Sequence, residues 1–243
     1  MSDETDWNEG VERILVVTAH PDDVDFGAAG SAAVWTAKGI AVTYCVVTDG
    51  DAGGFDPDVP RNEIGAIRRE EQTKAASQVG VHDLVFLGHP DGRLESTIEL
   101  RRDISRVIRQ VRPQRVVCQS PERSYERIYA SHPDHLAAGE GAICAVYPDA
   151  RNPFAHPELA AEGLDAWTVD EIWVMAGPGT NNRWVDTTDV IDRKIAALIC
   201  HESQMLEPDH MDPLIRTWGA AVAQSVGLPE GHLAEAFVRI DAR

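Results

Sequence analysis

Residues 13–38 read RILVVTAHPDDVDFGAAGSAAVWTAK and set the pattern for the fold. An apolar run of strand length leads through a polar turn into an alanine-rich stretch, which stops at Gly39, a residue type common just after a helix. The same alternation of short apolar runs and longer amphipathic stretches continues along the chain and is typical of βαβ units. The predicted strands are residues 13–18, 42–48, 84–87, 115–119 and 171–175.

Helices are predicted between these strands. Most of the strands are nearly continuous apolar runs, as expected when both faces of a sheet are covered. We therefore expect an α/β fold with three layers and a mostly parallel sheet, in one Rossmann-like domain over residues 13–243 after an acidic tail at residues 1–12. The predicted helices are residues 27–38, 61–79, 98–111, 133–146, 190–205 and 213–226, with irregular insertions at 49–60 and 149–167.

The composition narrows the classes of partner. The chain has 22 Lys and Arg residues against 40 Asp and Glu residues, a formal net charge of −18. This charge disfavours nucleic acid, whose non-specific binding depends on Lys and Arg displacing counterions, and an anionic membrane surface. No stretch approaches the roughly 18 apolar residues of a membrane span. The N-terminus lacks the features of a secretory signal and the cysteines form no C-x-x-C pair, so we expect a cytoplasmic protein.

The turn after the first predicted strand is rich in potential metal ligands. Residues 19–27, AHPDDVDFG, hold one histidine and three carboxylates. Proline and acidic residues are also ordinary at the start of a helix, where acids complement the helix dipole. In open α/β sheets, however, ligands bind at the carboxyl ends of the strands. His20 and Asp23 are three residues apart and can converge on one ion, while Asp22 points elsewhere.

A second polar turn, SHPDH, starts at Ser131 after the fourth predicted strand. Ser131 and Asp134 fit a capping box with proline in the first turn of a helix. His132 and His135 lie at i and i+3 on one face of that helix and can reach a shared site. The two interpretations are compatible, because a cap would fix the start of the helix that carries both histidines.

Together the two turns predict a catalytic metal site. His20, Asp23 and His135 supply two imidazoles and one carboxylate. With a position left for water, this is the composition of a catalytic zinc site, although Fe²⁺, Co²⁺ and Ni²⁺ accept the same ligands. Such a metal would lower the pKa of its bound water and polarise a carbonyl group.

The same turns supply candidates for proton transfer. Asp22 is not needed as a ligand and is the expected general base for the water. His132 would stabilise an oxyanion and then protonate a leaving nitrogen, with Asp134 as its orienting partner. Amide hydrolysis of this kind needs no covalent intermediate, which agrees with the absence of a G-x-S-x-G nucleophile elbow.

These residues resemble the signatures of the LmbE-like, or PIG-L, family of metal-dependent N-acetylglucosaminyl deacetylases. The first signature, A-H-P-D-D, stands at residues 19–23, and the second, H-P-D-H, at residues 132–135. Weaker resemblances extend over nearly the whole chain: T-D-G at 48–50, R-x-x-E at 68–71, P-D-G at 90–92, H-E-S-Q at 201–204 and E-A-F at 235–237.

The resemblance implies the same metal ligands, base and acid, and a self-associating protein. It also implies Arg68 as a contact to substrate hydroxyl or phosphate oxygens. The chain departs from the family pattern in two places. The glutamate that many members carry directly after the double aspartate is missing, and the nearest carboxylate is Asp25. A tyrosine that some members carry before the second signature is also missing, and the adjacent Tyr129 is its candidate replacement.

Three other polar residues have both an ordinary and a functional interpretation. Asp49 follows the second predicted strand and is either a turn residue or a functional one, as a partner that orients a ligating histidine or as a contact to the substrate. Asp91 is either a turn residue or an acceptor for sugar hydroxyls. His201 lies on a predicted helix, where a packed, hydrogen-bonded histidine is favoured over a ligand.

The leading hypothesis is a zinc-dependent hydrolase that removes an N-acetyl group from an amino sugar or sugar conjugate, a small-molecule partner. An amidase of a sugar–thiol conjugate would use the same metal centre. A nucleotide-binding oxidoreductase shares the alternating architecture, but three carboxylates occupy the turn where its pyrophosphate would bind. A non-catalytic carbohydrate-binding protein is disfavoured because both candidates for proton transfer are retained.

Overall fold

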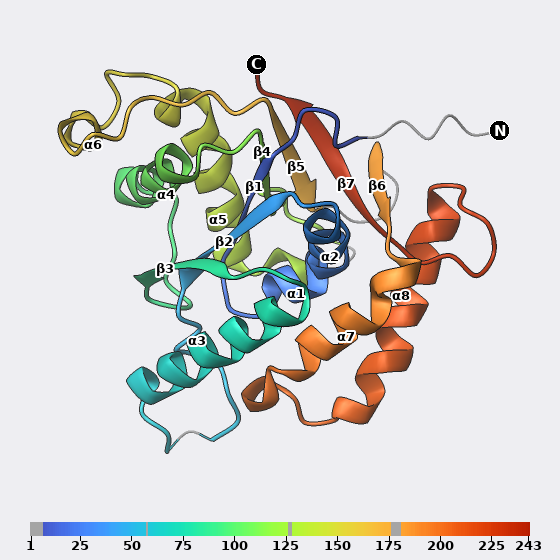
Figure 1. Ribbon diagram of the computed structural model, residues 1–243. Coiled ribbons are helices and arrows are strands. Elements are labelled where there is room, and N and C mark those ends of the chain that lie inside the picture. The colour runs from blue at the N-terminus through green and yellow to red at the C-terminus, as the bar shows by residue number, and fades with distance from the viewer. Residues whose placement is uncertain (1–6, 57, 126–127, 176–180) are drawn as a thin grey trace.

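A single seven-stranded sheet forms the centre of the computed structural model, which describes residues 7–56, 58–125, 128–175 and 181–243 (Figure 1). The strands are β1 (Arg13–Thr18), β2 (Ala41–Thr48), β3 (Asp83–His89), β4 (Arg115–Gln119), β5 (Glu171–Met175), β6 (Arg183–Asp186) and β7 (Ala234–Asp241). Their order is β3-β2-β1-β4-β5-β7-β6. The first five are parallel, and β7 is antiparallel to both of its neighbours. The predicted mostly parallel sheet is confirmed.

Helices cover both faces of the sheet (Figure 1). Alternate residues of a strand point to opposite faces, so Ile14 and Val16 of β1 join one core while Leu15 and Val17 join the other. The first core also includes residues of α2, α3 and α7, and the second includes residues of α4 and α5. The predicted three layers are therefore confirmed. The α-helices are α1 (Asp23–Gly27), α2 (Ala29–Ala37), α3 (Arg61–Gln78), α4 (Ile98–Val111), α5 (Pro133–Cys144), α6 (Pro157–Ala161), α7 (Ile191–Ile199) and α8 (Met211–Ser225).

The structure differs from the predicted elements in several places. The helix predicted to begin at Gly27 begins instead at Asp23, and it is interrupted at Ala28, whose non-helical backbone, with φ of −148°, separates α1 from α2. The helix predicted for residues 190–205 ends at Ile199. Strands β6 and β7 were not predicted, and the insertion expected at 149–167 contains the short helix α6.

Strand β7 is tied to the first helical layer by a buried carboxylate. Glu235 accepts hydrogen bonds from the backbone N–H groups of Gly30 and Ser31, at 3.0 and 2.7 Å, and forms an ion pair with Lys194. The first N–H groups of a helix have no partner within the helix, so an acceptor there stabilises its start. Glu235 thus links the last strand to α2 and α7.

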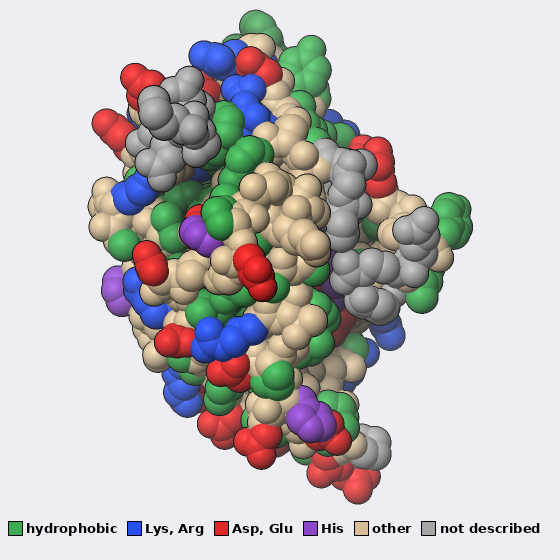
Figure 2. Space-filling model, turned by 90° about the vertical axis from the view of Figure 1, so that its right-hand side faces the viewer, with side chains coloured by type: hydrophobic (Ala, Val, Ile, Leu, Met, Phe, Trp, Pro, Cys, Tyr) green, Lys and Arg blue, Asp and Glu red, His purple; other side chains and the backbone are tan. Residues whose placement is uncertain are grey.

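Charges of both signs are mixed on the surface, and the described part of the N-terminal segment packs against the domain. On the face shown in Figure 2, Lys and Arg side chains are interspersed with Asp and Glu, and the described residues visible there form no extended basic patch. Within the predicted tail, Trp7 packs at 5.9 Å from Trp184 and beneath the guanidinium of Arg183. Among the helices of the described residues, none has the length and apolar character needed to cross a membrane.

The strand order reverses direction between β1 and β4, which are neighbours in the sheet. In open α/β sheets a crevice for ligands forms at such a point, beyond the carboxyl ends of the strands. The loops that leave these two strands are the ones that carry the two histidine-containing turns.

Candidate active site

The turn after β1 is held in a strained conformation. Asp22 has φ of 92°, a region that a residue with a side chain seldom adopts. Its backbone N–H donates to the side-chain oxygen of Gln72 at 2.8 Å. The guanidinium of Arg68 donates to an Asp22 carboxylate oxygen at 3.0 Å and to the carbonyl of Pro21 at 2.6 Å. Two side chains of α3 therefore fix the position of Asp22.

The turn after β4 begins α5 with a histidine cap. The Nδ1 atom of His132 accepts a hydrogen bond from the backbone N–H of Asp134 at 3.2 Å. The capping box predicted for Ser131 is therefore wrong, because the Ser131 hydroxyl instead accepts from the backbone N–H of Ser124 at 2.7 Å. Gly139 lets α5 approach β4 closely, since a Cβ there would lie 2.3 Å from the backbone oxygen of Gln119.

Asp23 brings the two turns together. One of its carboxylate oxygens lies 3.2 Å from Nδ1 of His20, and the other lies 3.0 Å from Nε2 of His135. The same carboxylate accepts the backbone N–H of His20 at 2.7 Å. The three residues predicted as metal ligands, which come from two distant parts of the chain, are thus in one contact network.

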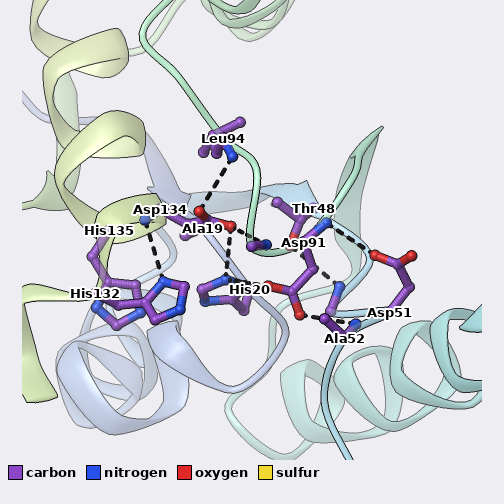
Figure 3. A network of polar contacts seen from close by, with 12 residues as sticks. Ala19, His20, Thr48, Asp51, Ala52, Asp91, Leu94, His132, Asp134 and His135 are labelled. Atoms are coloured by element: carbon purple, nitrogen blue, oxygen red, sulfur yellow. Dashed lines mark hydrogen bonds and ion pairs between the residues drawn. The ribbon is translucent and has the colours of Figure 1, made fainter.

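The far side of the His20 ring faces two more carboxylates (Figure 3). Its Nε2 atom lies 3.0 Å from Asp91 and 3.3 Å from Asp134. A carboxylate can only accept, so Nε2 carries a proton and the lone pair of a neutral ring lies on Nδ1, on the side of Asp23. The ring of His135 also hydrogen-bonds the backbone of Ala130.

His132 is the third imidazole of the cluster. One nitrogen atom from each of His20, His132 and His135 can be chosen so that all three lie within 4.8 Å of one another. The hydrogen bond to Nδ1 of His132 places the proton of its neutral ring on Nε2. This atom is therefore a hydrogen-bond donor, which favours a role toward an oxygen atom over a role as a ligand.

The charges of the histidines and carboxylates at this site favour the binding of a cation. Although burial disfavours a charged ring, the carboxylates of Asp134, Asp23 and Asp91 raise the pKa of His20 to about 12. The pKa of His135 is also raised, against burial, by Asp23. Burial and the neighbouring Asp23 raise the pKa of Asp22 to about 6. Two imidazole lone pairs directed at a buried carboxylate fit a divalent cation, whose charge would replace that of the protonated rings.

The predicted orienting contacts are partly wrong. The carboxylate of Asp134 is directed at His20, not at His132, and accepts the backbone N–H groups of Gly92 and Leu94. Asp49 forms a bidentate pair with Arg69, with both N–O distances at 2.7 Å, so no histidine is oriented by it.

The remaining predicted residues have the following positions. Asp91 orients His20 by contacting its Nε2 atom, and it accepts the backbone N–H of Ala52 at 3.1 Å. Arg68 is 4% exposed and donates to the protein itself, including the carbonyl of Gly50. The side chain of Tyr129 lies outside the part of the chain that the structure describes.

A cavity of about 680 Å³ lies beside the cluster, between α3 and the ends of β2 and β3. It shares a wall with the site, because Asp51 accepts the backbone N–H of Asp91 at 2.9 Å. Its lining carries both signs of charge, with Asp49, Asp51, Arg61, Arg69 and His89 among its residues. Such a lining suits a group that bears several hydroxyls.

The chain resembles known proteins in sequence. The model of a family described as GlcNAc-PI de-N-acetylase, PIG-L, matches residues 15–146. The chain is 34% identical to a diacetylchitobiose deacetylase of Thermococcus kodakarensis, over 91% of this chain and 80% of the relative. It is 32% identical to a probable N-acetyl-alpha-D-glucosaminyl L-malate deacetylase 2 of Bacillus cereus, over 82% and 87% of the two chains.

A solved structure shares the fold. The N,N'-diacetylchitobiose deacetylase of Pyrococcus horikoshii, in complex with an inhibitor, superposes with a TM-score of 0.87 and 27% identity. The match covers 97% of this chain and 86% of that one. The similarity therefore extends over the whole sheet and both turns.

Proposed function

The chain belongs to the PIG-L family, the GlcNAc-PI de-N-acetylases, and on that premise we propose that it is a hydrolase that removes the N-acetyl group from an amino sugar or sugar conjugate. The observation that carries this proposal is the contact of His20 and His135 with the two oxygens of Asp23, flanked by Asp22 and His132. An amide carbonyl placed there would meet a hydrogen-bond donor and a proton acceptor at once.

His20, Asp23 and His135 would hold the metal, which we propose is Zn²⁺, with Fe²⁺, Co²⁺ and Ni²⁺ as alternatives for the same donors. When bound, such a cation makes a water molecule more acidic and withdraws electrons from an amide carbonyl. Asp91 and Asp134 hold the proton on the far nitrogen of His20 and so keep its other nitrogen free for a metal.

The residues of the two turns would move the protons. Asp22 accepts a proton from the water that attacks the carbonyl carbon, and Arg68 keeps its carboxylate in place. His132 donates a hydrogen bond from Nε2 to the carbonyl oxygen as negative charge develops there. The carbon–nitrogen bond then breaks, the nitrogen takes up the proton that Asp22 accepted from the water, and acetate and a free amine leave.

The substrate class follows from the relatives and the cavity. The relatives named above act, by their names, on diacetylchitobiose and on an N-acetylglucosaminyl malate. The cavity beside the site, lined by charged residues of both signs, would hold the part of the substrate that is attached to the acetylated sugar. An amidase acting on a sugar–thiol conjugate needs the same residues and differs only in what fills that cavity.

The nucleotide-binding alternative is not favoured. In the turn after β1, Asp22 pairs with Arg68 and Asp23 contacts two histidines, so the place for a pyrophosphate is occupied by carboxylates. We further propose that residues 13–243 form one catalytic domain that acts on small molecules, in the cytoplasm and with self-association. The unpaired state of all four cysteines supports a reducing compartment.

Acetate release tests the proposal. Purified protein with its metal content measured is incubated with N,N'-diacetylchitobiose, with N-acetylglucosaminyl malate and with an N-acetylglucosaminyl inositol. We expect acetate and a free amine in equal amounts from at least one of them, and loss of this release after chelation. A protein that binds a metal but releases acetate from none of the three would contradict the proposed reaction for these substrates.

A further inference from the structure

Three buried polar side chains form a hydrogen-bond network that contacts the turn carrying Asp22. Gln72 of α3 accepts the backbone N–H of Asp22 at 2.8 Å and donates to a carboxylate oxygen of Asp25 at 2.8 Å. The same oxygen of Asp25 lies 2.8 Å from Nε2 of His201. Gln72 and Asp25 are fully buried, and His201 is 1% exposed. No part of the proposed reaction uses these three side chains.

The strained backbone of Asp22 indicates the function of these hydrogen-bonded side chains. A residue with φ of 92° keeps that conformation only when its surroundings impose it. The bond from Gln72 holds the N–H of Asp22, whereas Arg68 holds the carbonyl of Pro21 and the Asp22 carboxylate. The carbonyl of Asp22 accepts backbone N–H groups of α1. Without Gln72, the peptide N–H of Asp22 would lose its acceptor, and one of the contacts that impose the strained conformation would be removed.

The orientation of Gln72 is fixed by Asp25. A side-chain amide has a donor end and an acceptor end that are difficult to tell apart by shape. A carboxylate only accepts, so Asp25 requires the NH₂ end of Gln72 and leaves its oxygen facing Asp22. If the Gln72 amide were reversed, its NH₂ group would face the backbone N–H of Asp22, and its oxygen would face the carboxylate of Asp25. Neither pair could form a hydrogen bond.

His201 holds Asp25 from the other side and is itself anchored. It lies just after α7, in a segment whose Ser203 donates its backbone N–H and its hydroxyl to Glu71, both at 2.7 Å. Glu71 and Gln72 are neighbours on α3, so the segment of residues 201–204 and the turn after β1 are fastened to the same part of one helix.

We propose that Gln72, oriented by Asp25 and His201, is a positioning residue that keeps the proposed base Asp22 in its reactive conformation. This inference rests on the proposed function. It also gives a role to Asp25, which stands one place later than the glutamate that many members carry. The Asp25 carboxylate acts through Gln72 on the base and makes no contact with His20 or His135 among the interactions of the described residues.

The first test replaces Gln72 with Leu, which keeps the volume and removes both hydrogen bonds. Gln72→Leu should lower kcat about 10- to 100-fold, because small displacements of a reacting group cost that much, while KM changes less than about twofold. The matched control is Gln78→Leu, an exposed position on the same helix, which should keep the kcat of the original protein. Metal content should stay unchanged in both.

A second readout does not depend on activity. Hydrogen exchange of a peptide that contains the Asp22 amide should be faster in Gln72→Leu than in the original protein and in Gln78→Leu. If Gln72→Leu does not fold, Gln72→Asn keeps a polar amide that is one methylene too short to reach both partners, and the same increase in exchange is expected. Unchanged exchange in a folded Gln72 variant would overturn the proposal.

Variants of His201 and a double variant separate positioning from simple destabilisation. His201→Gln, which can still donate to Asp25, should keep more of kcat than His201→Leu. In the Asp22→Asn background, Gln72→Leu should cause less than a threefold further loss, since the group that it positions is already disabled. Full additivity of the two losses would contradict the proposal.

If the original protein releases no acetate at all, the proposed function fails, and hydrogen exchange still decides whether Gln72 holds the turn.

Discussion

Two buried charged regions lie at opposite ends of the parallel strands, and they are built differently. At the amino ends, Arg115 of β4 pairs with Glu171 of β5 at 2.7 Å, and its other two nitrogens donate to Asn8 and to the carbonyl of Trp7. Glu171 is also paired with Arg239. Each charged group there has partners supplied by the protein.

At the carboxyl ends, carboxylates outnumber permanent cations. Asp23, Asp91 and Asp134 surround His20, whose ring must be protonated to balance them when no other cation is present. Buried charge that the protein neutralises with its own arginines supports the fold, whereas buried charge that is balanced only by titrating rings indicates a place for a bound cation. The comparison predicts that the two regions respond differently to substitution.

The largest effect is expected at the carboxyl end. Asp22→Asn should lower kcat about 10²- to 10⁴-fold, the range of contributions from a general base, because the amide cannot accept a proton from water. Thermal unfolding and metal content should change little, since Asn keeps the size of Asp. The check is acetate release together with metal analysis on the same sample, and full activity of Asp22→Asn would remove Asp22 from the role of base.

At the amino end, the expected effect is on stability alone. Arg115→Met should lower the free energy of unfolding by about 3–5 kcal/mol, because it leaves the charge of Glu171 with one partner fewer in a buried place. Chemical denaturation measures this loss. The exposed Arg216→Met is the control, since its ion pair with Asp212 lies at the surface and should contribute much less.

The activity of the folded fraction sharpens the comparison. Per molecule of folded protein, Arg115→Met should keep the kcat of the original chain. A large drop in kcat would mean that the amino end of the sheet also supports the reaction and that the two regions are not separate.

A smaller effect is expected from pH. Against the effect of burial, Arg115 and Arg239 hold the pKa of Glu171 below its usual value of 4.5. A carboxyl group with a lowered pKa in the folded state stabilises the protein fully above the pKa of the unfolded chain, and this contribution is lost as the pH falls through the folded pKa. The stability of Glu171→Gln should therefore fall less steeply below about pH 4.5 than that of the original chain. Equal slopes in denaturation curves across this range would contradict the role of Glu171.

The carboxyl-end site was largely predictable because of its position in the fold. Apolar runs indicated the parallel strands, and parallel strands bring the turns that follow them to one edge, which is how His20, Asp23 and His135 come into contact. His132 and His135 are also neighbours, with ring centroids 5.3 Å apart, although His132 caps α5 and only His135 lies within the helix.

The partners of these residues were not predictable from sequence patterns. Asp134 faces His20 and the backbone N–H groups of Gly92 and Leu94, which come from other parts of the chain, and no local pattern encodes these contacts. Gln72 lies within a charged helix and gives no signal in the sequence that its side chain reaches the turn after β1. Strand β7 was missed because its sequence, AEAFVRID, mixes charged and apolar residues and contains no continuous apolar run of strand length.

Counting the divalent ions bound per chain tests the central claim most directly. The original protein, stripped by chelation and dialysed against Zn²⁺, should bind one tightly held ion. His20→Ala and His135→Ala, one in each turn, should each lose it, while His132→Ala should keep it. Full binding by either of the first two variants, or loss only in His132→Ala, would contradict a metal site shared by the two turns through Asp23.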